Sequence, residues 1–210
     1  LLRLPDDWSF VQGAAVPEVW YTAYINLFDE GQLRGGETAL IHAGASGVGT
    51  AAIQLAIDAG ARTIATAGSE EKVAFCRELG ATAINYKTQD FLEQVMAATN
   101  GRGVDVILDP VGGDYLARNA AALCRFGRLV NIGLLGGAKG ELNMGQVLGK
   151  RLRIVGSLLR PRPLEEKIAI TRRFAAEVMP RLADGRLRPI VDRVFPIAEA
   201  QAAHEYVLEN

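Results

Sequence analysis

Cysteine and histidine, the residues that most often form metal and covalent catalytic sites, are scarce in this sequence. Only two of each occur among the 210 residues. Cys76 and Cys124 lie in separate helical patterns, and His42 and His204 lie far apart in the chain, so none of them has the spacing of metal ligands. We predict core packing for both cysteines, because free cysteine is usually buried, with a disulfide or a metal site as the alternative. This usage suits a reducing compartment such as the cytoplasm.

The sequence also lacks a long apolar run, a targeting segment and a large net charge. No run approaches the roughly 20 apolar residues that span a bilayer, and the N-terminus resembles neither a signal peptide nor a transit peptide. A net charge of −1 argues against a dedicated nucleic-acid-binding protein. We therefore predict a soluble protein that binds neither membranes nor nucleic acid.

The charge is distributed unevenly along the chain. Residues 150–193 contain 12 Lys or Arg and 5 Asp or Glu. We interpret this basic stretch as a solvated or subunit-facing surface, with a contribution to phosphate binding as the alternative.

Short apolar runs that alternate with helical patterns are the main feature that is present. The runs are continuous rather than alternating, which is typical of strands covered on both faces. Strands are predicted at residues 38–43, 62–67, 82–86, 104–109, 128–133 and 151–159. Helices are predicted between them at residues 48–60, 69–80, 91–99 and about 115–124. This order predicts an α/β fold with a six-stranded, doubly wound parallel sheet of the Rossmann type.

Helical patterns also flank the predicted sheet. Upstream we predict a short helix at 9–16, capped by Ser9, and a longer one that starts at Pro17 and ends near Gly31 or Leu33. Downstream we predict a helix at 164–185, an extended segment at 188–197 and a last helix at 198–209, after a short helix near residues 144–150.

A cluster of small residues follows the first predicted strand, in the sequence AGASGVG. Gly44-x-Ser46-x-x-Gly49 is a serine-substituted form of the G-x-G-x-x-G turn, which binds a dinucleotide when it lies between a strand and a helix. Gly44 allows the tight turn, Ser46 and Gly47 let a pyrophosphate approach the backbone, and Gly49 lets helix and strand pack closely. A P-loop is excluded because no lysine follows Gly49. A glycine-rich turn without a ligand is the alternative.

The end of the second predicted strand favours one form of the cofactor. NAD sites usually place an acidic residue there to bind the ribose 2′-hydroxyl, but this strand is followed by Gly68 and Ser69. With Lys72, these residues form an acid-free pocket that suits a 2′-phosphate, so we predict NADP. Tyr86, at the end of the third strand, is expected near the same phosphate or the adenine. A solvated helix position is the alternative for Lys72, and ordinary packing at the edge of the sheet is the alternative for Tyr86.

Three further strand ends should line the same edge of the sheet. We expect Gly133 and Leu134, after the fifth strand, to lie near a nicotinamide. Asp109 ends the fourth strand, where it either takes part in catalysis or holds the turn at Gly112–Gly113. His42 lies just before the first turn, and we favour a buried, hydrogen-bonded side chain over a catalytic one.

Many of these segments together resemble one family. The segments that carry the resemblance are AAVPEVWYTAYINL, ALIHAGASGVGTAAIQLA, GSEEK, LGATAINYK, VDVILDPVGG, GRLVNIGLLGG, GSLLRPRP and FPIAEAQAAHEYV. They are similar to the zinc-independent quinone oxidoreductase branch of the medium-chain dehydrogenase/reductases, and most similar to the stress-induced NADPH:quinone oxidoreductases. The resemblance covers essentially the whole chain.

The resemblance implies a domain arrangement. Such proteins have an N-terminal GroES-like catalytic domain, and this chain, which begins at Leu1 rather than at methionine, resembles only the part that follows that domain. We therefore expect part of a longer protein: a helical linker at 1–34, an NADP-binding Rossmann domain at 35–186 and a return segment at 187–210. The family's catalytic tyrosine belongs to the absent domain, so no catalytic residue is predicted here. Family members form homodimers through an edge strand, here near 151–159.

The resemblance also implies site residues and an activity. It places Ser46, Gly47 and Val48 at the pyrophosphate, and Thr22 beside the nicotinamide, although a plain helix position is an alternative for Thr22. Such proteins use no metal and pass hydride from NADPH to quinones or activated enones. Two other functions stay open: an enoyl reductase module of fatty-acid or polyketide synthesis, and a non-catalytic NADPH sensor.

Overall fold

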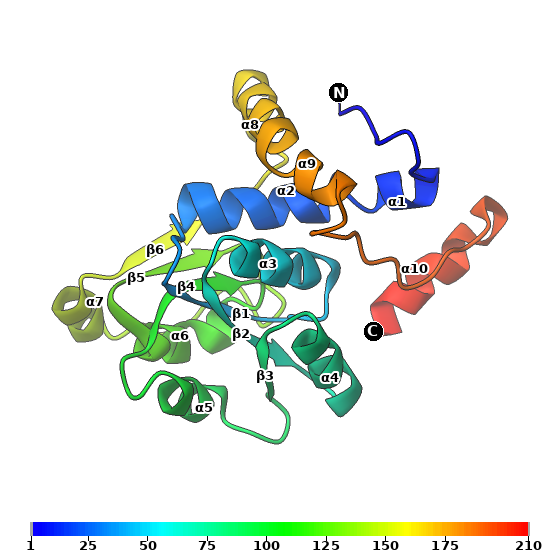
Figure 1. Ribbon diagram of the computed structural model, residues 1–210. Coiled ribbons are helices and arrows are strands. Elements are labelled where there is room, and N and C mark those ends of the chain that lie inside the picture. The colour runs from blue at the N-terminus through cyan, green and yellow to red at the C-terminus, as the bar shows by residue number, and fades with distance from the viewer. Residues whose placement is uncertain (1, 210) are drawn as a thin grey trace.

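The computed structural model describes residues 2–209. The first residue of the predicted linker, Leu1, and the last residue of the predicted return segment, Asn210, lie outside the described residues. Its centre is one six-stranded sheet in the order β3-β2-β1-β4-β5-β6, with every neighbouring pair parallel (Figure 1). The strands are β1 Thr38–Ile41, β2 Arg62–Ala67, β3 Thr82–Asn85, β4 Val104–Asp109, β5 Leu123–Asn131 and β6 Arg153–Gly156. The predicted six-stranded doubly wound sheet is confirmed.

Helices cover both faces of the sheet. The connecting helices are α3 Gly47–Asp58, α4 Glu70–Glu78, α5 Phe91–Ala98, α6 Leu116–Ala122, which follows a 3-10 turn η2 at Gly113–Tyr115, and α7 Met144–Lys150. Along β1, Ala39 and Ile41 belong to the apolar core under α3, whereas Leu40 belongs to the opposite core with Phe91 and Val95 of α5. Consecutive strand residues are therefore buried on opposite sides, which explains the continuous apolar runs.

The N-terminal helical region differs from its prediction. After α1 (Phe10–Ala14), which Ser9 caps, the expected single helix is α2 (Val19–Tyr24) followed by a π-helical turn, η1 (Ile25–Glu30). In this turn the Gly31 amide donates to the Asn26 carbonyl over 3.0 Å, five residues back. A wider turn of this kind leaves no mark on an apolar helical pattern, and it is frequent at functional sites.

Two more boundaries differ. The predicted helix at 164–185 is divided into α8 (Leu164–Glu177) and α9 (Met179–Ala183), because Pro180 has no amide hydrogen to continue the ladder. Strand β5 begins at Leu123 rather than at residue 128, and it accommodates the left-handed backbone of Phe126 by a shift of register against β4. Residues 188–196 form no strand, and α10 (Ala200–Glu209) follows the short turn η3 (Ile197–Glu199).

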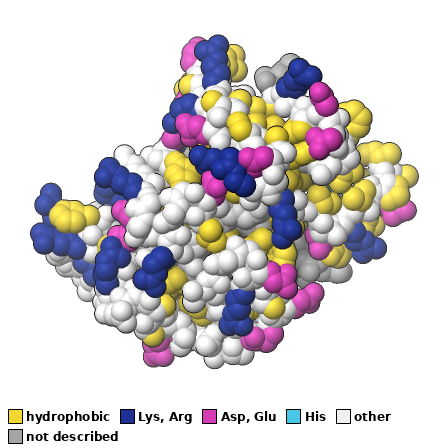
Figure 2. Space-filling model, in the orientation of Figure 1, with side chains coloured by type: hydrophobic (Ala, Val, Ile, Leu, Met, Phe, Trp, Pro, Cys, Tyr) yellow, Lys and Arg dark blue, Asp and Glu magenta, His cyan; other side chains and the backbone are white. Residues whose placement is uncertain are grey.

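Part of the basic stretch at 150–193 pairs with acids of the same chain. Arg173 pairs with Asp29 at 2.6 Å, Arg181 pairs with Asp58 at 2.8 Å, and Arg162 pairs with Glu30 at 2.6 Å. These pairs tie the loop before α8, α8 itself and α9 to η1 and α3, so part of the basic excess is neutralised internally. Basic and acidic side chains lie next to one another over this region in Figure 2. In the part of the chain that the structure describes, no helix is long and apolar enough to cross a membrane.

Both cysteines are free and buried, Cys76 in α4 and Cys124 in β5. Burial raises the pKa of each thiol to about 11. Core packing is therefore confirmed for both, although the predicted helical position of Cys124 is wrong.

Candidate functional site

The glycine turn between β1 and α3 has almost no spare volume. A Cβ on Gly49 would lie 2.3 Å from the Ala43 carbonyl oxygen and 2.6 Å from that of Gly44. A Cβ on Gly44 would lie 2.8 Å from Ala65 and 3.0 Å from the Cys76 sulfur. Gly49 thus permits the close packing of helix on turn that its place in the motif predicts. At Gly44 a larger side chain is excluded by the packing of this residue against Ala65 of β2 and Cys76 of α4.

Ser46 begins the helix that follows. Its Oγ accepts a hydrogen bond from the Gly49 amide over 3.1 Å, which makes it the N-cap of α3. The amides of Gly47 and Val48 occupy the first helical positions, where no acceptor exists within the helix. A hydroxyl that accepts this bond keeps its own hydrogen for a ligand. The turn therefore presents several N–H and O–H donors at the positive end of α3.

A cavity of about 410 Å³ opens beside this turn, at the carboxyl ends of the strands. Of the residues predicted for the site, Thr22, Ser46, Val48, Gly49 and Gly133 line it. Leu134 is 57% exposed and does not line it, whereas its neighbour Leu135 does. The sequence did not single out the other polar lining residues, which are Glu18, Asn26, Ser157 and Arg160.

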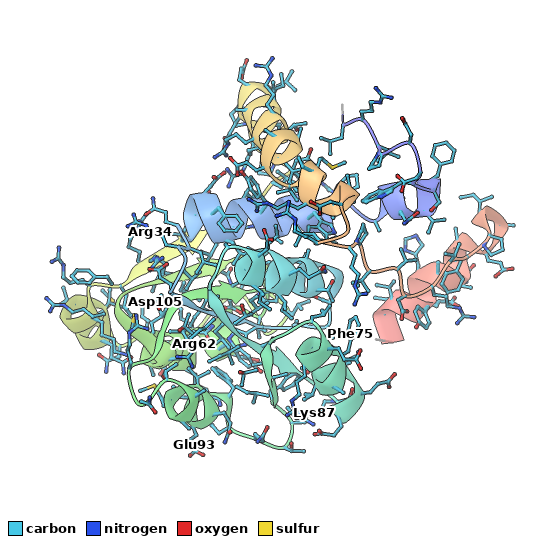
Figure 3. The ribbon with its side chains drawn as sticks, viewed as in Figure 1. Arg34, Arg62, Phe75, Lys87, Glu93 and Asp105 are labelled. Carbon is cyan, nitrogen blue, oxygen red and sulfur yellow. The ribbon has the colours of Figure 1, made fainter. Side chains whose placement is uncertain are left out.

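A second group of predicted residues lies at the ends of β2 and β3. A Cβ on Gly68 would lie 2.8 Å from the Tyr86 hydroxyl, so these two residues are neighbours. Ser69 caps α4 by accepting from the Lys72 amide over 3.2 Å, which fixes the start of that helix. Figure 3 shows Lys87, just after β3, at the opposite end of the strands from Arg62, the first residue of β2. None of this group lines the cavity.

His42, which lines the cavity, is held by two side chains. Its Nδ1 lies 3.0 Å from Thr66 Oγ1, and its Nε2 lies 2.8 Å from Asn119 Oδ1. The amide nitrogen of Asn119 donates to Asp109 over 3.1 Å, so its oxygen must accept from His42. The imidazole therefore carries its hydrogen on Nε2. Burial lowers the pKa of His42, which keeps the ring neutral.

Asp109 organises the loop after β4. Its carboxylate accepts from the amide of Val111 over 2.7 Å and from that of Gly112 over 3.2 Å. Gly112 has a φ of 85°, in the left-handed region that favours glycine. The structure thus favours the turn-holding role of Asp109 over a catalytic one. The Gly136 amide donates to the Val111 carbonyl over 2.7 Å, which joins this loop to the one after β5.

Asn119 and Asn26 are functional candidates that the sequence analysis missed. Each is a single asparagine in an otherwise apolar helical pattern, and each is buried, with 0% and 2% exposure respectively. The sequence offered one signal for them, a single polar residue on an apolar helix face. Such a residue indicates a buried amide, and buried amides need hydrogen-bond partners.

A second, apolar cavity of about 490 Å³ lies between α1, residues 190–195 and α10. Its surroundings expose large apolar side chains, among them Phe10 (90%) and Ile197 (93%). Figure 2 shows hydrophobic side chains gathered on this part of the molecule. Contiguous apolar surface of this kind is typical of a contact with another protein part.

Comparison with known protein families gives a match over most of the chain. Residues 47–175 match the family described as zinc-binding dehydrogenase, which is more than half of the chain. The highly reducing polyketide synthase cm3B of Cordyceps militaris is 34% identical over 97% of this chain, which spans 8% of that protein.

Solved structures show the same relationship in three dimensions. The quinone oxidoreductase of Thermus thermophilus, also solved in complex with NADPH, matches 99% of this chain and 65% of its own, with 34% identity and a TM-score of 0.87. The CurK enoyl reductase matches 98% of this chain and 61% of its own, with 34% identity and a TM-score of 0.83. This chain belongs to the zinc-binding dehydrogenase family, as a quinone-oxidoreductase-like Rossmann unit of the medium-chain dehydrogenase/reductase superfamily.

Proposed function

We propose that the chain is the cofactor-binding portion of an NADPH-dependent oxidoreductase that transfers hydride to quinones or activated enones. The observation that carries this proposal is the cavity shared by Thr22, Ser46 and Gly133 beside the tightly packed turn at Gly49. A pyrophosphate fits the donors of Ser46, Gly47 and Val48 at the start of α3. The cavity then receives the nicotinamide end of the cofactor.

The phosphate-bearing end is proposed to lie at the ends of β2 and β3, beside Gly68 and Ser69. In this proposal Lys72 and Tyr86 supply a cation and a hydroxyl for the 2′-phosphate. The Glu70 carboxylate accepts from Asn85, the last residue of β3, over 2.5 Å, so this oxygen is already bound within the protein. Gly44 and Gly49 contribute by shaping the turn, and Leu134 by covering the nicotinamide from the loop after β5.

The chain's own contribution to the reaction is placement. When bound, the cofactor supplies the hydride. The turn and the cavity walls fix the distance and the angle at which the hydride meets the acceptor, and apolar lining residues such as Leu108 and Ile132 exclude water. The Asp109–Asn119–His42 chain keeps the cavity wall in one arrangement. These are the contributions of a positioning domain.

A zinc ion, which the family's description implies, does not fit the described residues. No three His, Cys, Asp or Glu side chains are grouped there so as to hold a metal ion. Both nitrogens of His42 are engaged, and Cys76 and Cys124 are buried in separate places. The described residues therefore offer no zinc site for the proposed hydride transfer.

An enoyl reductase module of polyketide synthesis is the second candidate, favoured by the similarity to the CurK enoyl reductase and to polyketide synthase cm3B. The two activities share the cofactor site and differ in the acceptor. Assays of the full-length protein with an acyl-thioester enone and with an ortho-quinone separate them. Tight NADPH binding without turnover of either acceptor would instead support the sensor function.

We also propose two contacts of this unit. The apolar surface around α1 and α10 packs against a further part of the protein that completes the substrate site. Strand β6, at one edge of the sheet, pairs with a second copy to form a homodimer. Support comes from its edge position and from Ile154, which is 41% exposed there.

Binding to the 210-residue chain tests the cofactor assignment directly. We expect nicotinamide fluorescence to report tighter binding of NADPH than of NADH. Ser46→Val should weaken binding of both, and Lys72→Gln should weaken NADPH more than NADH. Equal affinities for the two cofactors would contradict the NADP assignment. Binding of neither would contradict the proposed site as a whole.

A further inference from the structure

Asn26 is buried in the wall of the cavity with half of its amide unpaired. Its Nδ2 donates to the Thr22 carbonyl over 2.8 Å, one turn back along α2. Its Oδ1 is buried and has no hydrogen-bond partner, and within the described residues only Thr63 Oγ1 shares this condition. A buried acceptor without a donor costs free energy, so its retention calls for a partner that binds there.

The backbone around Asn26 is also unusual. Asn26 lies at the start of the π-helical turn η1, and its carbonyl receives the Gly31 amide over 3.0 Å. Asn26 is 2% exposed and the flanking Ile25 and Leu27 are fully buried, so this turn lies inside the fold rather than at its surface. Turns of this width are frequent at functional sites. They change the direction in which the following side chains point.

Ser157 supplies the complementary group on the same cavity. It is 9% exposed and follows β6, and its Oγ accepts from Arg162 over 3.0 Å. Arg162 is itself fixed by Glu30 and Glu166. Because the Ser157 oxygen already accepts, its own hydrogen remains for a second bond. Two residues that line the cavity thus have unused hydrogen-bonding capacity: Asn26 has a buried acceptor and Ser157 has a hydroxyl hydrogen.

We infer that Asn26 and Ser157 bind the carboxamide of the nicotinamide ring, with Asn26 Oδ1 accepting from the amide NH₂ and Ser157 donating to the amide oxygen. This inference rests on the proposed function, because it requires the nicotinamide end of the cofactor in this cavity. A primary carboxamide offers one donor group and one acceptor, which matches the pair. Asn26 is then a positioning residue that fixes which way the ring faces.

A cofactor analogue isolates the bond to Asn26. In 3-acetylpyridine adenine dinucleotide phosphate, a methyl group replaces the amide NH₂ and the carbonyl is kept. We expect the wild-type chain to bind NADP⁺ about five-fold more tightly than this analogue, the effect of one neutral hydrogen bond. In Asn26→Leu the two should bind equally. Ser157→Ala should weaken both by a similar factor and leave their ratio unchanged.

Thr63→Val is the matched control. It removes the other unpaired buried oxygen, which lies on β2 and does not line the cavity, and replaces it with a side chain of the same shape. The ratio of the two affinities should stay at its wild-type value in this variant.

The binding measurements separate failure of the inference about Asn26 from failure of the proposed function. Equal binding of NADP⁺ and the analogue to the wild-type chain would overturn the inference, whether or not Asn26→Leu folds. An unchanged ratio in a folded Asn26→Leu variant would overturn it as well. Absence of NADP⁺ binding to the wild-type chain would instead refute the proposed function.

Discussion

Asn119 connects His42 to Asp109 across the carboxyl edge of the sheet, with its oxygen 2.8 Å from His42 Nε2 and its nitrogen 3.1 Å from Asp109 Oδ2. An amide in this position can satisfy both neighbours only if the imidazole donates and the carboxylate accepts. Three residues from three different elements thereby fix one another. Burial of the imidazole lowers its pKa, because it disfavours the charged form, and this has a consequence for stability.

We predict that His42 makes the folded chain sensitive to mild acid. Its folded pKa is lowered, so below the unfolded value of about 6.5 the unfolded chain binds a proton there that the folded chain does not. The free energy of unfolding then falls by about 1.4 kcal/mol per pH unit from this group until the folded pKa is reached. Denaturation with urea at pH 7, 6 and 5 should show a shallower loss in His42→Gln than in the wild type.

His204→Gln is the control for this experiment, because it removes the other histidine from an exposed position on α10. Its loss of stability between pH 7 and 5 should equal that of the wild type. Identical slopes for the wild type and His42→Gln would show that His42 is protonated in the folded chain.

Gly49→Ala should damage the turn. The added Cβ would meet two backbone oxygens that cannot move aside easily, so we expect a loss of about 1–3 kcal/mol in unfolding free energy and weaker NADPH binding. Gly149→Ala in α7 meets nothing within 4 Å and should stabilise the chain slightly, since alanine favours helix. Thermal unfolding and NADPH titration measure both effects. Wild-type stability and affinity in Gly49→Ala would refute the packing argument.

Substitution of Arg128 should lower the free energy of unfolding more than most substitutions outside the proposed cofactor site. Its guanidinium pairs with Glu37 at 2.6 Å and donates to the Gly31 and Gln32 carbonyls over 2.7 and 3.0 Å. Removing it leaves the partly buried Glu37 carboxylate without its cation and the Gly31 and Gln32 carbonyls without the donors it supplied, so Arg128→Met should cost about 3–5 kcal/mol.

The exposed pair of Arg3 and Asp6 offers the comparison for Arg128, because both side chains are largely in solvent. Arg3→Met should change the unfolding free energy by less than about 1 kcal/mol. Chemical denaturation of the two variants measures the difference. A similar small effect at both positions would mean that Arg128 does not hold the segment before β1.

The proposed dimer predicts a change of mass when the edge strand is charged. Ile154→Lys should convert a dimer into a monomer in sedimentation equilibrium, because a lysine on an edge strand opposes pairing. Val207→Lys, on α10 away from the sheet, should leave the dimer intact. A wild-type chain that is monomeric at high concentration would contradict the proposal.

The sheet could be predicted from the sequence because its signals are local. Each strand is a short buried run, and each helix begins or ends at a residue whose backbone role is recognisable, such as Ser69 at the start of α4 and Gly80 after its end. Right-handed parallel connections then place the carboxyl ends of the strands along one edge of the sheet.

The parts that could not be predicted depend on distant partners. The π-helical turn at Asn26, the long β5 strand and the role of Arg128 each depend on contacts made by residues far away in the chain. The glycine turn was visible as a motif. The buried amides of Asn26 and Asn119 gave only the weak signal of one asparagine in an apolar helical pattern, because their roles depend on hydrogen bonds that form when the chain folds.

The hydrogen bonds between the loops after β4 and β5 have a consequence for how this family member can diversify. Gly113 donates to the Gly137 carbonyl over 2.8 Å, and Gly136 donates to that of Val111 over 2.7 Å, so the two loops form one unit. An insertion in either loop would break the bonds of both. If the proposed function holds, new acceptor preferences would therefore have to arise elsewhere on the cavity wall, for example in the segment that begins at Ser157.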